Sequence, residues 1–275
     1  MAGMLYLVPT PIGNLGDISP RCAETLAKAD FIAAEDTRVT LRLLNHLELK
    51  KSLVSYHEHN KAESGRKILA RLLAGETCAL VTDAGTPAIS DPGEDLVRLC
   101  ADNGVTVCAL PGPCAAVTAL SMSGLPTGRF VFEGFLPTQS KQRRQRLSAL
   151  SREPRTVILY EAPHRLKGTL SDLLSCFDPQ RRISLCRELT KLHEQVLRTT
   201  LQGAADYYEK NEPRGEYVLI LEGAAETDAG QVTLEQAVRL VSALTDKGLS
   251  KKDAVKQVAR DTGFPRNPLY DAVMK

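Results

Sequence analysis

The chain has 275 residues, of which 43% are hydrophobic and 25% are charged, and its formal net charge is +2. This length and composition fit a soluble globular protein of about two domains, because single cores stop growing near ~250–300 residues. The near-zero charge excludes an overall basic field for nucleic acid, so any nucleic-acid surface must be local.

The cysteines and the apolar runs indicate the compartment. Seven cysteines occur, in an odd number, without a CxxC pair and mostly beside apolar residues. This pattern predicts reduced thiols in the cytoplasm and no zinc or other metal site. No apolar run approaches the ~18 residues of a membrane span. The start, MAGMLYLVPTP, lacks the regions of a signal peptide and is interpreted as a first strand.

Short apolar runs alternate with helical patterns along most of the chain. The first helix is marked by Ser19 as its N-cap and by Pro20 at its first position. Alternation of helices with nearly continuous apolar strands predicts mainly parallel sheets covered by helices. In chain order, the predicted strands are 5–8, 31–34, 53–56, 78–82, 105–110, 130–132, 156–160, 183–186 and 217–221, and the predicted helices between them are 38–47, 61–74, 94–103, 114–122, 141–150, 164–176 and 201–210.

The organisation changes at two points. The segment SGLPTGR, 123–129, is a predicted hinge between two α/β sheets, and after Gly223 only helical patterns remain, at 233–246, 251–261 and 265–274. We therefore predict an α/β fold in three parts, the last resembling a helix–turn–helix. The predicted parts are an N-terminal α/β domain over 1–122, a C-terminal α/β domain over 123–226 and a helical extension over 227–275.

Ligands of open α/β sheets bind outside the carboxyl ends of the strands. The motifs GxGxxG, GxxxxGK[ST] and GxSxG are absent there, which disfavours dinucleotide, nucleoside-triphosphate and hydrolase sites. Loops rich in glycine and proline, above all DAGTPAISDPG at 83–93, instead bring bare backbone groups against a compact ligand, which suits S-adenosylmethionine. Polar, glycine or proline residues follow the predicted strands at 9–14, 35–38, 57–59, 83–87, 111–113, 161–165 and 187–188.

Five motifs carry a resemblance to a known family. LVPTPIGNLGDI, AAEDTR, TDAGTPAISDPG, LPGP and LYEAPHR, in this order, resemble those of the bacterial 16S ribosomal RNA (cytidine 2′-O)-methyltransferases of the small-subunit methyltransferase I type, in the tetrapyrrole-methylase superfamily. The similarity covers nearly the whole chain. It implies two α/β domains with S-adenosylmethionine in the cleft between them, a homodimer, and a cytidine of the small ribosomal subunit, known as 1402, as substrate.

The resemblance also implies a cofactor loop. Gly85-Thr86-Pro87 matches the Gly-Asp-Pro loop of the superfamily, in which Gly85 permits close approach and Pro87 fixes the turn. Asp91 and Pro92 are interpreted instead as the N-cap and first residue of the next helix. The residues implied to bind the cofactor are Pro11, Gly13, Asp83, Gly85, Thr86, Pro87, Ile89, Ser90, Ala115, Glu161 and Ala162.

A ribose hydroxyl must lose its proton, and a general base contributes about 10²–10⁴-fold to the rate. The cluster Glu35-Asp36-Thr37-Arg38 places carboxylates near an arginine able to hold a phosphate. The alternative is an ordinary helix start, with Asp36 as cap and Arg38 in solvent. The residues do not rank the base, and the predicted catalytic residues are Glu35, Asp36, Glu161 and Lys191.

Contacts with RNA are expected mainly between cations and phosphates. The run KQRRQR, 141–146, would make one side of a helix basic, although such runs are usually solvated faces. His164-Arg165 opens a helix and offers an anion site, with a plain surface pair as the alternative. The predicted RNA-contacting residues are Arg38, His57, Arg143, Arg144, Arg146, His164, Arg165 and Arg187.

Two other functions stay open. One is a tetrapyrrole (precorrin-type) methyltransferase, whose relatives carry a Gly-rich first loop and Gly-Asp-Pro where this chain has Pro9-Thr10-Pro11 and Gly85-Thr86-Pro87. The other is a non-catalytic RNA-binding assembly factor. The basic run and the helical tail favour an RNA substrate, and the tail either contacts ribosomal RNA or packs on a dimer partner.

Overall fold

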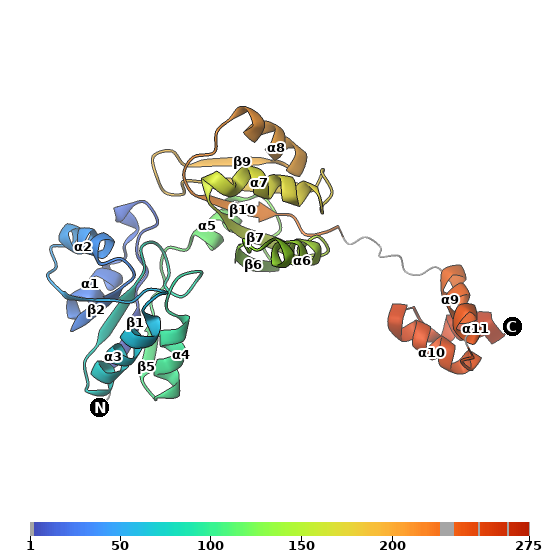
Figure 1. The fold of residues 1–275 in the computed structure, drawn as a ribbon, viewed down its shortest axis with the longest axis horizontal. Helices are drawn as coiled ribbons and strands as arrows, with labels where there is room; N and C mark the ends of the chain where they lie inside the picture. The colour runs from blue at the N-terminus through green and yellow to red at the C-terminus, as the bar shows by residue number, and fades with distance from the viewer. Residues whose placement is uncertain (1–2, 226–233, 247, 263, 275) are drawn as a thin grey trace. The chain divides into compact units, whose positions relative to one another are not determined.

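The protein forms two compact units, Met1–Gly223 and Ala224–Lys275. The computed structural model describes residues 3–225, 234–246, 248–262 and 264–274. The first unit contains two five-stranded sheets with their helices, and the described part of the second unit is helical (Figure 1). The predicted fold class, two α/β domains with a helical extension, is therefore confirmed. The predicted boundary at 226/227 lies outside the described residues.

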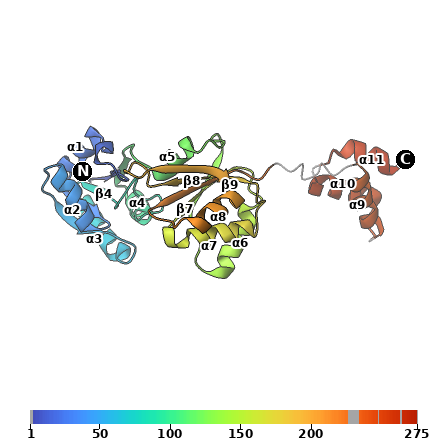
Figure 2. The same ribbon diagram turned by 90° about the horizontal axis from the view of Figure 1, so that it is seen from above.

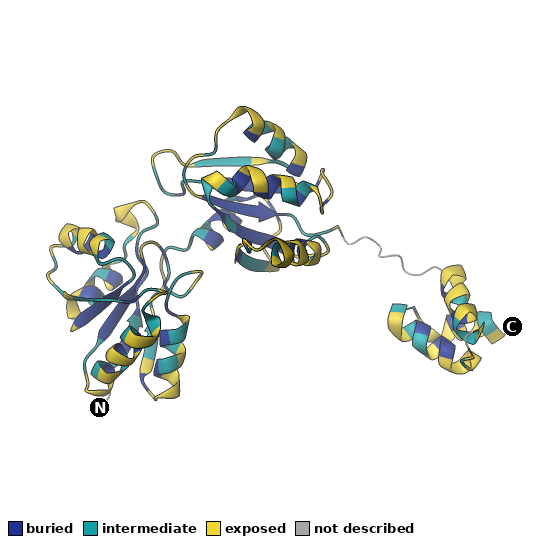
Figure 3. Ribbon diagram, viewed as in Figure 1, coloured by how far each residue is buried: buried dark blue, intermediate teal, exposed yellow. Residues whose placement is uncertain are grey.

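The first sheet is entirely parallel and has the strand order β3-β2-β4-β1-β5. Every residue of β2 and β4 is buried, as expected for central strands covered on both faces (Figure 3). All five predicted strands of this sheet are found, and no end differs from its predicted position by more than one residue. The bounds are β1 (Met4–Leu7), β2 (Phe31–Ala34), β3 (Ser52–Ser55), β4 (Cys78–Val81) and β5 (Thr106–Ala109).

Helices cover both faces of the first sheet. Leu26 and Leu44 pack on one face, and Leu72 and Leu96 pack on the other. The connections after β1 and β4 run in opposite directions along the sheet, which opens a crevice between them at the carboxyl edge. The helices are α1 (Pro20–Lys28) and α2 (Thr37–His46) on the first face and α3 (Lys61–Leu73) and α4 (Glu94–Asp102) on the second.

The second sheet corrects the prediction of a mainly parallel arrangement. Its order is β6-β7-β10-β8-β9, and only β6 and β7 pair in parallel. The residues 188–194 between β8 and β9 are too few for a parallel crossover, so the chain reverses. The strand β9 was not predicted because four of the six residues in QVLRTT are polar and the strand is only partly buried. The bounds are β6 (Phe130–Phe135), β7 (Thr156–Glu161), β8 (Arg182–Arg187), β9 (Gln195–Thr200) and β10 (Tyr217–Leu221).

Helix α5 (Ala115–Met122) belongs with the second sheet by its packing. Ala119 and Leu120 contact the cluster that contains Ile158 and Ile220 of that sheet, although our predicted domain boundary follows this helix. Figure 2 shows α5 on one side of the sheet and α6, α7 and α8 on the other. The three helices, which complete a separate core, are α6 (Ser140–Leu150), α7 (Pro163–Leu174) and α8 (Leu201–Lys210).

The described part of the second unit has three helices around a small core that contains Val241, Val255 and Leu269. Ser250 begins the second of them, because its Oγ accepts the Asp253 N–H at 3.1 Å. Within the described ranges, no helix combines the length and the hydropathy needed to cross a bilayer. The helices are α9 (Leu234–Asp246), α10 (Lys251–Thr262) and α11 (Arg266–Met274).

Candidate active site

A cleft of about 490 Å³ lies within the first unit, between the loops of the two sheets. One wall is the loop after β4, a second is the start of α5, and the third comes from the ends of β7 and β10. Pro87 is buried and does not line the cleft. The predicted site residues that line the cleft are Gly85, Thr86, Ile89, Ser90, Ala115, Glu161, Ala162 and His164.

The loop after β4 holds a conformation that few sequences adopt. Gly85 has φ +87°, and its N–H and C=O both bond to Thr10, at 3.0 and 2.9 Å. Ala88 and Ser90 also have positive φ, 68° and 62°, which costs a non-glycine residue about 1–2 kcal/mol each. Such strain gathers at functional sites. The glycines and prolines of this loop therefore shape a wall of exposed backbone.

Asp91 is a residue of the cleft that the sequence interpretation missed. Helix α4 starts at Glu94 with Gly93 as its N-cap, so the predicted capping role of Asp91 is wrong. Its carboxylate makes no hydrogen bond or ion pair within the described part of the chain. Burial, and then the charges of Glu35 and Asp83, raise the pKa of Asp91 to about 7. Gly93 was the sequence signal that Asp91 is not the cap, because a glycine at this position permits the helix to start later, at Glu94.

Replacement of Asp91 by asparagine should stabilise the protein in a pH-dependent way. Unfolded Asp91 ionises near pH 4 and folded Asp91 near pH 7, so its charge opposes folding above that range and not below it. One pKa unit equals about 1.4 kcal/mol and Asp91 is only partly buried, so we expect D91N to add about 2 kcal/mol to the free energy of unfolding at pH 8. Urea unfolding at pH 8 and pH 4 measures this.

The exposed Asp206 of α8 provides the control for this prediction, because Asp206→Asn should give no such dependence on pH. An equal effect of D91N at both pH values would contradict the raised pKa of Asp91.

Two further carboxylates lie at the carboxyl ends of the neighbouring strands β2 and β4. The Asp83 N–H donates to Glu35 Oε2 at 3.3 Å, and the Asp36 N–H donates to Asp83 Oδ1 at 3.0 Å. Burial raises the pKa of Glu35 and of Asp83, against the opposing effect of these backbone hydrogen bonds. A half-buried carboxylate with a raised pKa suits a proton acceptor.

Asp36 has a different environment from Glu35. Its Oδ1 accepts the Arg38 N–H at 2.8 Å, and its Oδ2 lies 2.6 Å from Arg38 Nη2. The hydrogen bonds from Arg38 lower the pKa of Asp36 to about 2. These contacts match the helix-start alternative, with Asp36 as the cap of α2 and Arg38 extending into solvent. A carboxylate with so low a pKa is a weak base.

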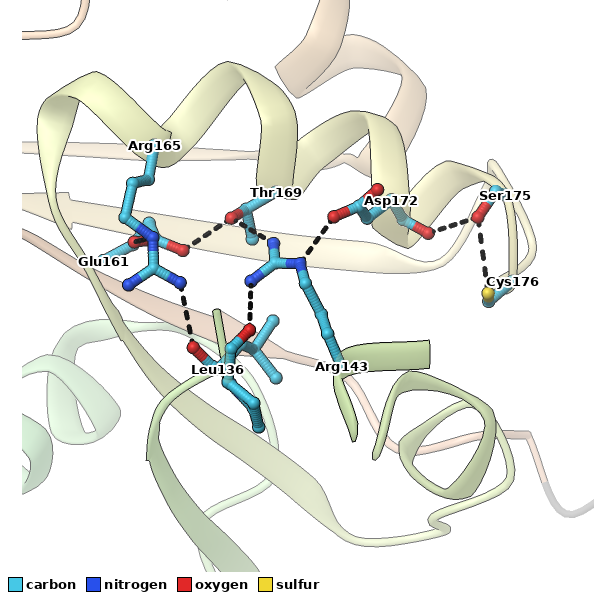
Figure 4. Close-up of polar contacts among 9 residues, drawn as sticks. Leu136, Arg143, Glu161, Arg165, Thr169, Asp172, Ser175 and Cys176 are labelled. Atoms are coloured by element: carbon cyan, nitrogen blue, oxygen red, sulfur yellow. Dashed lines mark hydrogen bonds and ion pairs between the residues drawn. The ribbon is translucent and has the colours of Figure 1, made fainter. Parts of the chain in front are cut away.

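Glu161 is buried, with 2% of its surface exposed, in a network of side chains (Figure 4). Its Oε1 accepts the Ala162 N–H at 2.9 Å and lies 3.4 Å from Arg165 Nε, and its Oε2 accepts the Thr169 hydroxyl at 2.5 Å. Arg143 donates to the same Thr169 hydroxyl at 2.8 Å. Every oxygen of Glu161 is thus occupied, which favours a structural role over proton transfer.

Lys191 joins the two domains. Its Nζ lies 3.0 Å from Glu188 and 2.9 Å from Glu216, and its stem crosses Gly13, where a Cβ would lie 2.5 Å from Lys191 Cγ. Burial lowers the pKa of Lys191, but the hydrogen bonds to Glu216 and Glu188 outweigh it and raise the pKa. Lys191 is therefore a cation at neutral pH and is poorly suited to accept a proton.

The other predicted RNA-contacting residues occupy varied environments. Arg144 and Arg146 are exposed on α6, and Arg146 pairs with Glu133. Arg143 is held inside the Glu161 network and pairs with Asp172 at 2.6 Å. His57 and Arg187 are half-buried, each with one buried nitrogen that has no hydrogen-bond partner.

Besides Pro87, three predicted cofactor-binding residues do not line the cleft, namely Pro11, Gly13 and Asp83. They line a second pocket of about 220 Å³ beside α2. Consecutive residues of the chain line the two cavities, because Thr82 and Asp83 line the pocket whereas Ala84 and Gly85 line the cleft. The predicted site is therefore divided into two parts.

The lining of the cleft suits a nucleoside with a cationic centre. Ile12, Ile89 and Val218 supply apolar walls, the loop at Gly85 supplies backbone groups, and Asp91 supplies negative charge. Neither lysine nor arginine is among the residues that line the cleft, so a pyrophosphate would lack counter-charges. No three His, Cys, Asp or Glu side chains of the described residues are grouped to hold a metal ion.

Comparison with known proteins gives consistent matches. The family model described as Tetrapyrrole (Corrin/Porphyrin) Methylases matches residues 4–205, and the RsmI C-terminal HTH domain model matches residues 231–275. Ribosomal RNA small subunit methyltransferase I of Synechocystis is 49% identical over 98% of this chain and 96% of that protein. The protein of the same name from Bacillus subtilis is 45% identical over 98% and 94%.

Solved structures share the fold of the first unit. Uroporphyrin-III C-methyl transferase from Thermus thermophilus, in complex with S-adenyl homocysteine, gives a TM-score of 0.58 at 21% identity, covering 80% of this chain and 97% of that one. A cobalt precorrin-4 methyltransferase gives a TM-score of 0.60 at 18% identity, covering 80% and 94%. At such low identity these likenesses concern the fold alone.

Proposed function

The chain belongs to the tetrapyrrole methylase family, within the group of ribosomal RNA small subunit methyltransferase I, and from this membership we propose that it methylates the ribose 2′-hydroxyl of a cytidine of 16S rRNA, that known as 1402. S-adenosylmethionine is the methyl donor. The names of the relatives state neither which hydroxyl is methylated nor which nucleotide carries it, and these two points are proposed here. The half-buried Glu35 supports the proposal, because its carboxylate accepts the N–H of Asp83, which lines the pocket next along the chain to Ala84 of the cleft.

The cofactor, when bound, supplies a methyl group on a positively charged sulfur. The chain acts on the other reactant: the Glu35 carboxylate would take the proton of the 2′-hydroxyl, whose oxygen would receive the methyl group. Asp83 contributes by fixing Glu35, through the N–H that it donates to Glu35 Oε2. Alignment of the two reactants supplies up to roughly 7–11 kcal/mol, so the rigid loop after β4 matters as much as the base.

The exposed cations of α6 are the proposed contacts to RNA phosphates. Lys141, Arg144 and Arg146 are exposed on this helix, and its first turn carries no acid. Arg143 is omitted because Thr169 and Asp172 hold its guanidinium inside the protein. The basic surface is therefore smaller than the sequence run suggested.

Reversal of charge at Arg144 and Arg146 should weaken binding to small ribosomal subunits. Because each phosphate contact releases counterions, R144E/R146E is expected to reduce the slope of log affinity against log salt by roughly 2 and to lower affinity more than tenfold. Filter binding from 50 to 300 mM salt measures both. The matched control reverses two exposed arginines elsewhere, R21E/R66E, which should leave the slope unchanged. An unaltered slope in R144E/R146E removes α6 from the RNA surface.

The decisive test of the function is mass spectrometry of rRNA nucleosides. Small subunits from cells that lack the modification are incubated with the protein and labelled S-adenosylmethionine, and labelled 2′-O-methylcytidine is expected at one position. Unlabelled rRNA, with label instead in a precorrin-like pigment supplied in a parallel incubation, would favour the precorrin-type alternative. Binding to subunits without any transfer would favour the assembly factor.

We also propose that the protein acts in the cytoplasm as a homodimer. Both proposals come from the family and, for the compartment, from the cysteines, which are all free thiols in the structure. Analytical ultracentrifugation of the full chain at micromolar concentration, where we expect twice the 30.0 kDa monomer mass, tests the dimer.

A further inference from the structure

The pocket beside α2 is a cavity that methyl transfer alone does not explain. The loop after β1, the first turns of α2 and the end of β4 enclose about 220 Å³ there. This volume is below the ~300–1,000 Å³ of pockets that hold drug-sized ligands, so it suits a single ring rather than a whole nucleotide. Thr82 and Asp83 of the pocket directly precede Ala84 and Gly85 of the cleft along the chain.

Two buried hydroxyls of this pocket have no partner. Thr40 is 3% exposed and Thr82 is 2% exposed, and neither Oγ1 makes a hydrogen bond. The neighbouring Thr10 hydroxyl is satisfied, since it donates to the Thr82 carbonyl at 3.1 Å. A buried hydroxyl without a partner costs about 1–3 kcal/mol, so each of the two has a specific need for a polar ligand.

Two charged side chains also line the pocket, one acidic and one basic. Asp83 accepts the Asp36 N–H with Oδ1, and its Oδ2 has no hydrogen-bond partner among the residues described. Arg42 lines the pocket from α2, is exposed, and takes part in none of the ion pairs of the described chain. A carboxylate acceptor, two hydroxyls and a cation suit a flat polar ring that is linked to a phosphate.

We propose that this pocket binds the base of the nucleotide that is methylated, and that it selects cytosine over uracil. The proposal rests on the proposed function. The N4 amino group of cytosine donates to a carboxylate such as Asp83, whereas uracil presents a carbonyl oxygen at the same place. The two threonine hydroxyls complete the hydrogen bonds of the ring edge. Asp83 thus distinguishes the two bases, and Thr40 and Thr82 are positioning residues that hold the ring edge against it.

The position of the pocket explains how the ribose reaches the cofactor. A base in the pocket must leave its RNA stack, at a cost of a few kcal/mol that base contacts repay. We place its ribose toward Asp83, the pocket residue that directly precedes the cleft along the chain and donates its N–H to Glu35. A base held in the pocket therefore sets the position of the ribose hydroxyl that reacts.

The threonine methyl groups give a direct test of binding. In the full-length protein, cytidine 5′-monophosphate is expected to shift the NMR methyl signals of Thr40 and Thr82, and uridine 5′-monophosphate at equal concentration is not. Thr40→Val and Thr82→Val keep the shape of each side chain and remove only an unpartnered hydroxyl, so T40V/T82V should fold at least as stably as the wild type. Thr25→Val on α1, outside the pocket, is the matched control.

Methylation kinetics supply the second arm. Wild-type protein should prefer subunits with cytidine over uridine at the target by more than tenfold in kcat/KM, and T40V/T82V should lose most of this preference with unchanged affinity for S-adenosylmethionine. Undiminished preference in T40V/T82V together with unshifted methyl signals overturns the pocket assignment while rRNA methylation stands. Shifted methyl signals in a protein that methylates no rRNA overturn the proposed function instead.

Discussion

Gly85→Val is expected to lower the affinity for S-adenosylmethionine at least 100-fold, measured by calorimetry. Gly85 has φ +87°, a region that a β-branched residue adopts only under strain, and a Cβ there would lie 3.3 Å from Ile12 Cγ2. The valine methyl groups would extend from that Cβ among the walls of the cleft, which Ile12 and Gly85 both line. The added side chain would thus have two effects, because it would fill space that the ligand needs and would also distort the loop.

The control must separate strain from occupancy. Gly104 has φ +69° and nothing within 4 Å of an added Cβ, and it does not line the cleft. Gly104→Val therefore carries similar backbone strain without filling the site, and it should lose about 1–3 kcal/mol of stability while binding the cofactor normally. Normal calorimetric affinity in Gly85→Val would show that the loop after β4 is not the seat of the cofactor.

The composition of this loop was readable from the sequence, but its effect on neighbouring residues was not. Glycines and prolines after an apolar strand predict backbone exposed to a ligand, and Gly85, Thr86 and Ile89 do line the cleft. Asp91 was assigned to a helix cap because Asp-Pro is a strong local signal. The positive φ of Gly93 delays the helix to Glu94 and turns Asp91 into the cleft instead.

The division of the site into two cavities could not be predicted from strand ends alone. Alternation of strands and helices predicts that Pro11, Glu35 and Asp83 share one edge of a sheet, and they do. Which side of the loop after β4 each residue faces depends on the hydrogen bonds between Thr10 and Gly85, which join distant segments. Likewise β9 lacks an apolar run and is defined only by pairing with β8.

Glu35→Gln is expected to reduce kcat for rRNA methylation about 10²–10⁴-fold and to leave cofactor binding intact. Glutamine keeps the size of the side chain and the hydrogen bond from the Asp83 N–H, but it does not accept the hydroxyl proton. Because burial raises the pKa of Glu35 above 4.5, the wild-type rate should rise as pH increases through that raised pKa and then level off. The rise should be absent in the variant, as single-turnover rates from pH 5 to 9 would show.

Asp36→Asn distinguishes Glu35 from its neighbour as the base. Asparagine caps a helix as well as aspartate does, so α2 should persist. Since the pKa of Asp36 is about 2, this carboxylate is ionised throughout the range tested and adds no rise to the pH profile. We therefore expect D36N to keep a rate within a few-fold of the wild type and the same pH dependence. A large loss of rate in D36N with full activity in Glu35→Gln would move the base to Asp36 and leave the raised pKa of Glu35 as a consequence of burial alone.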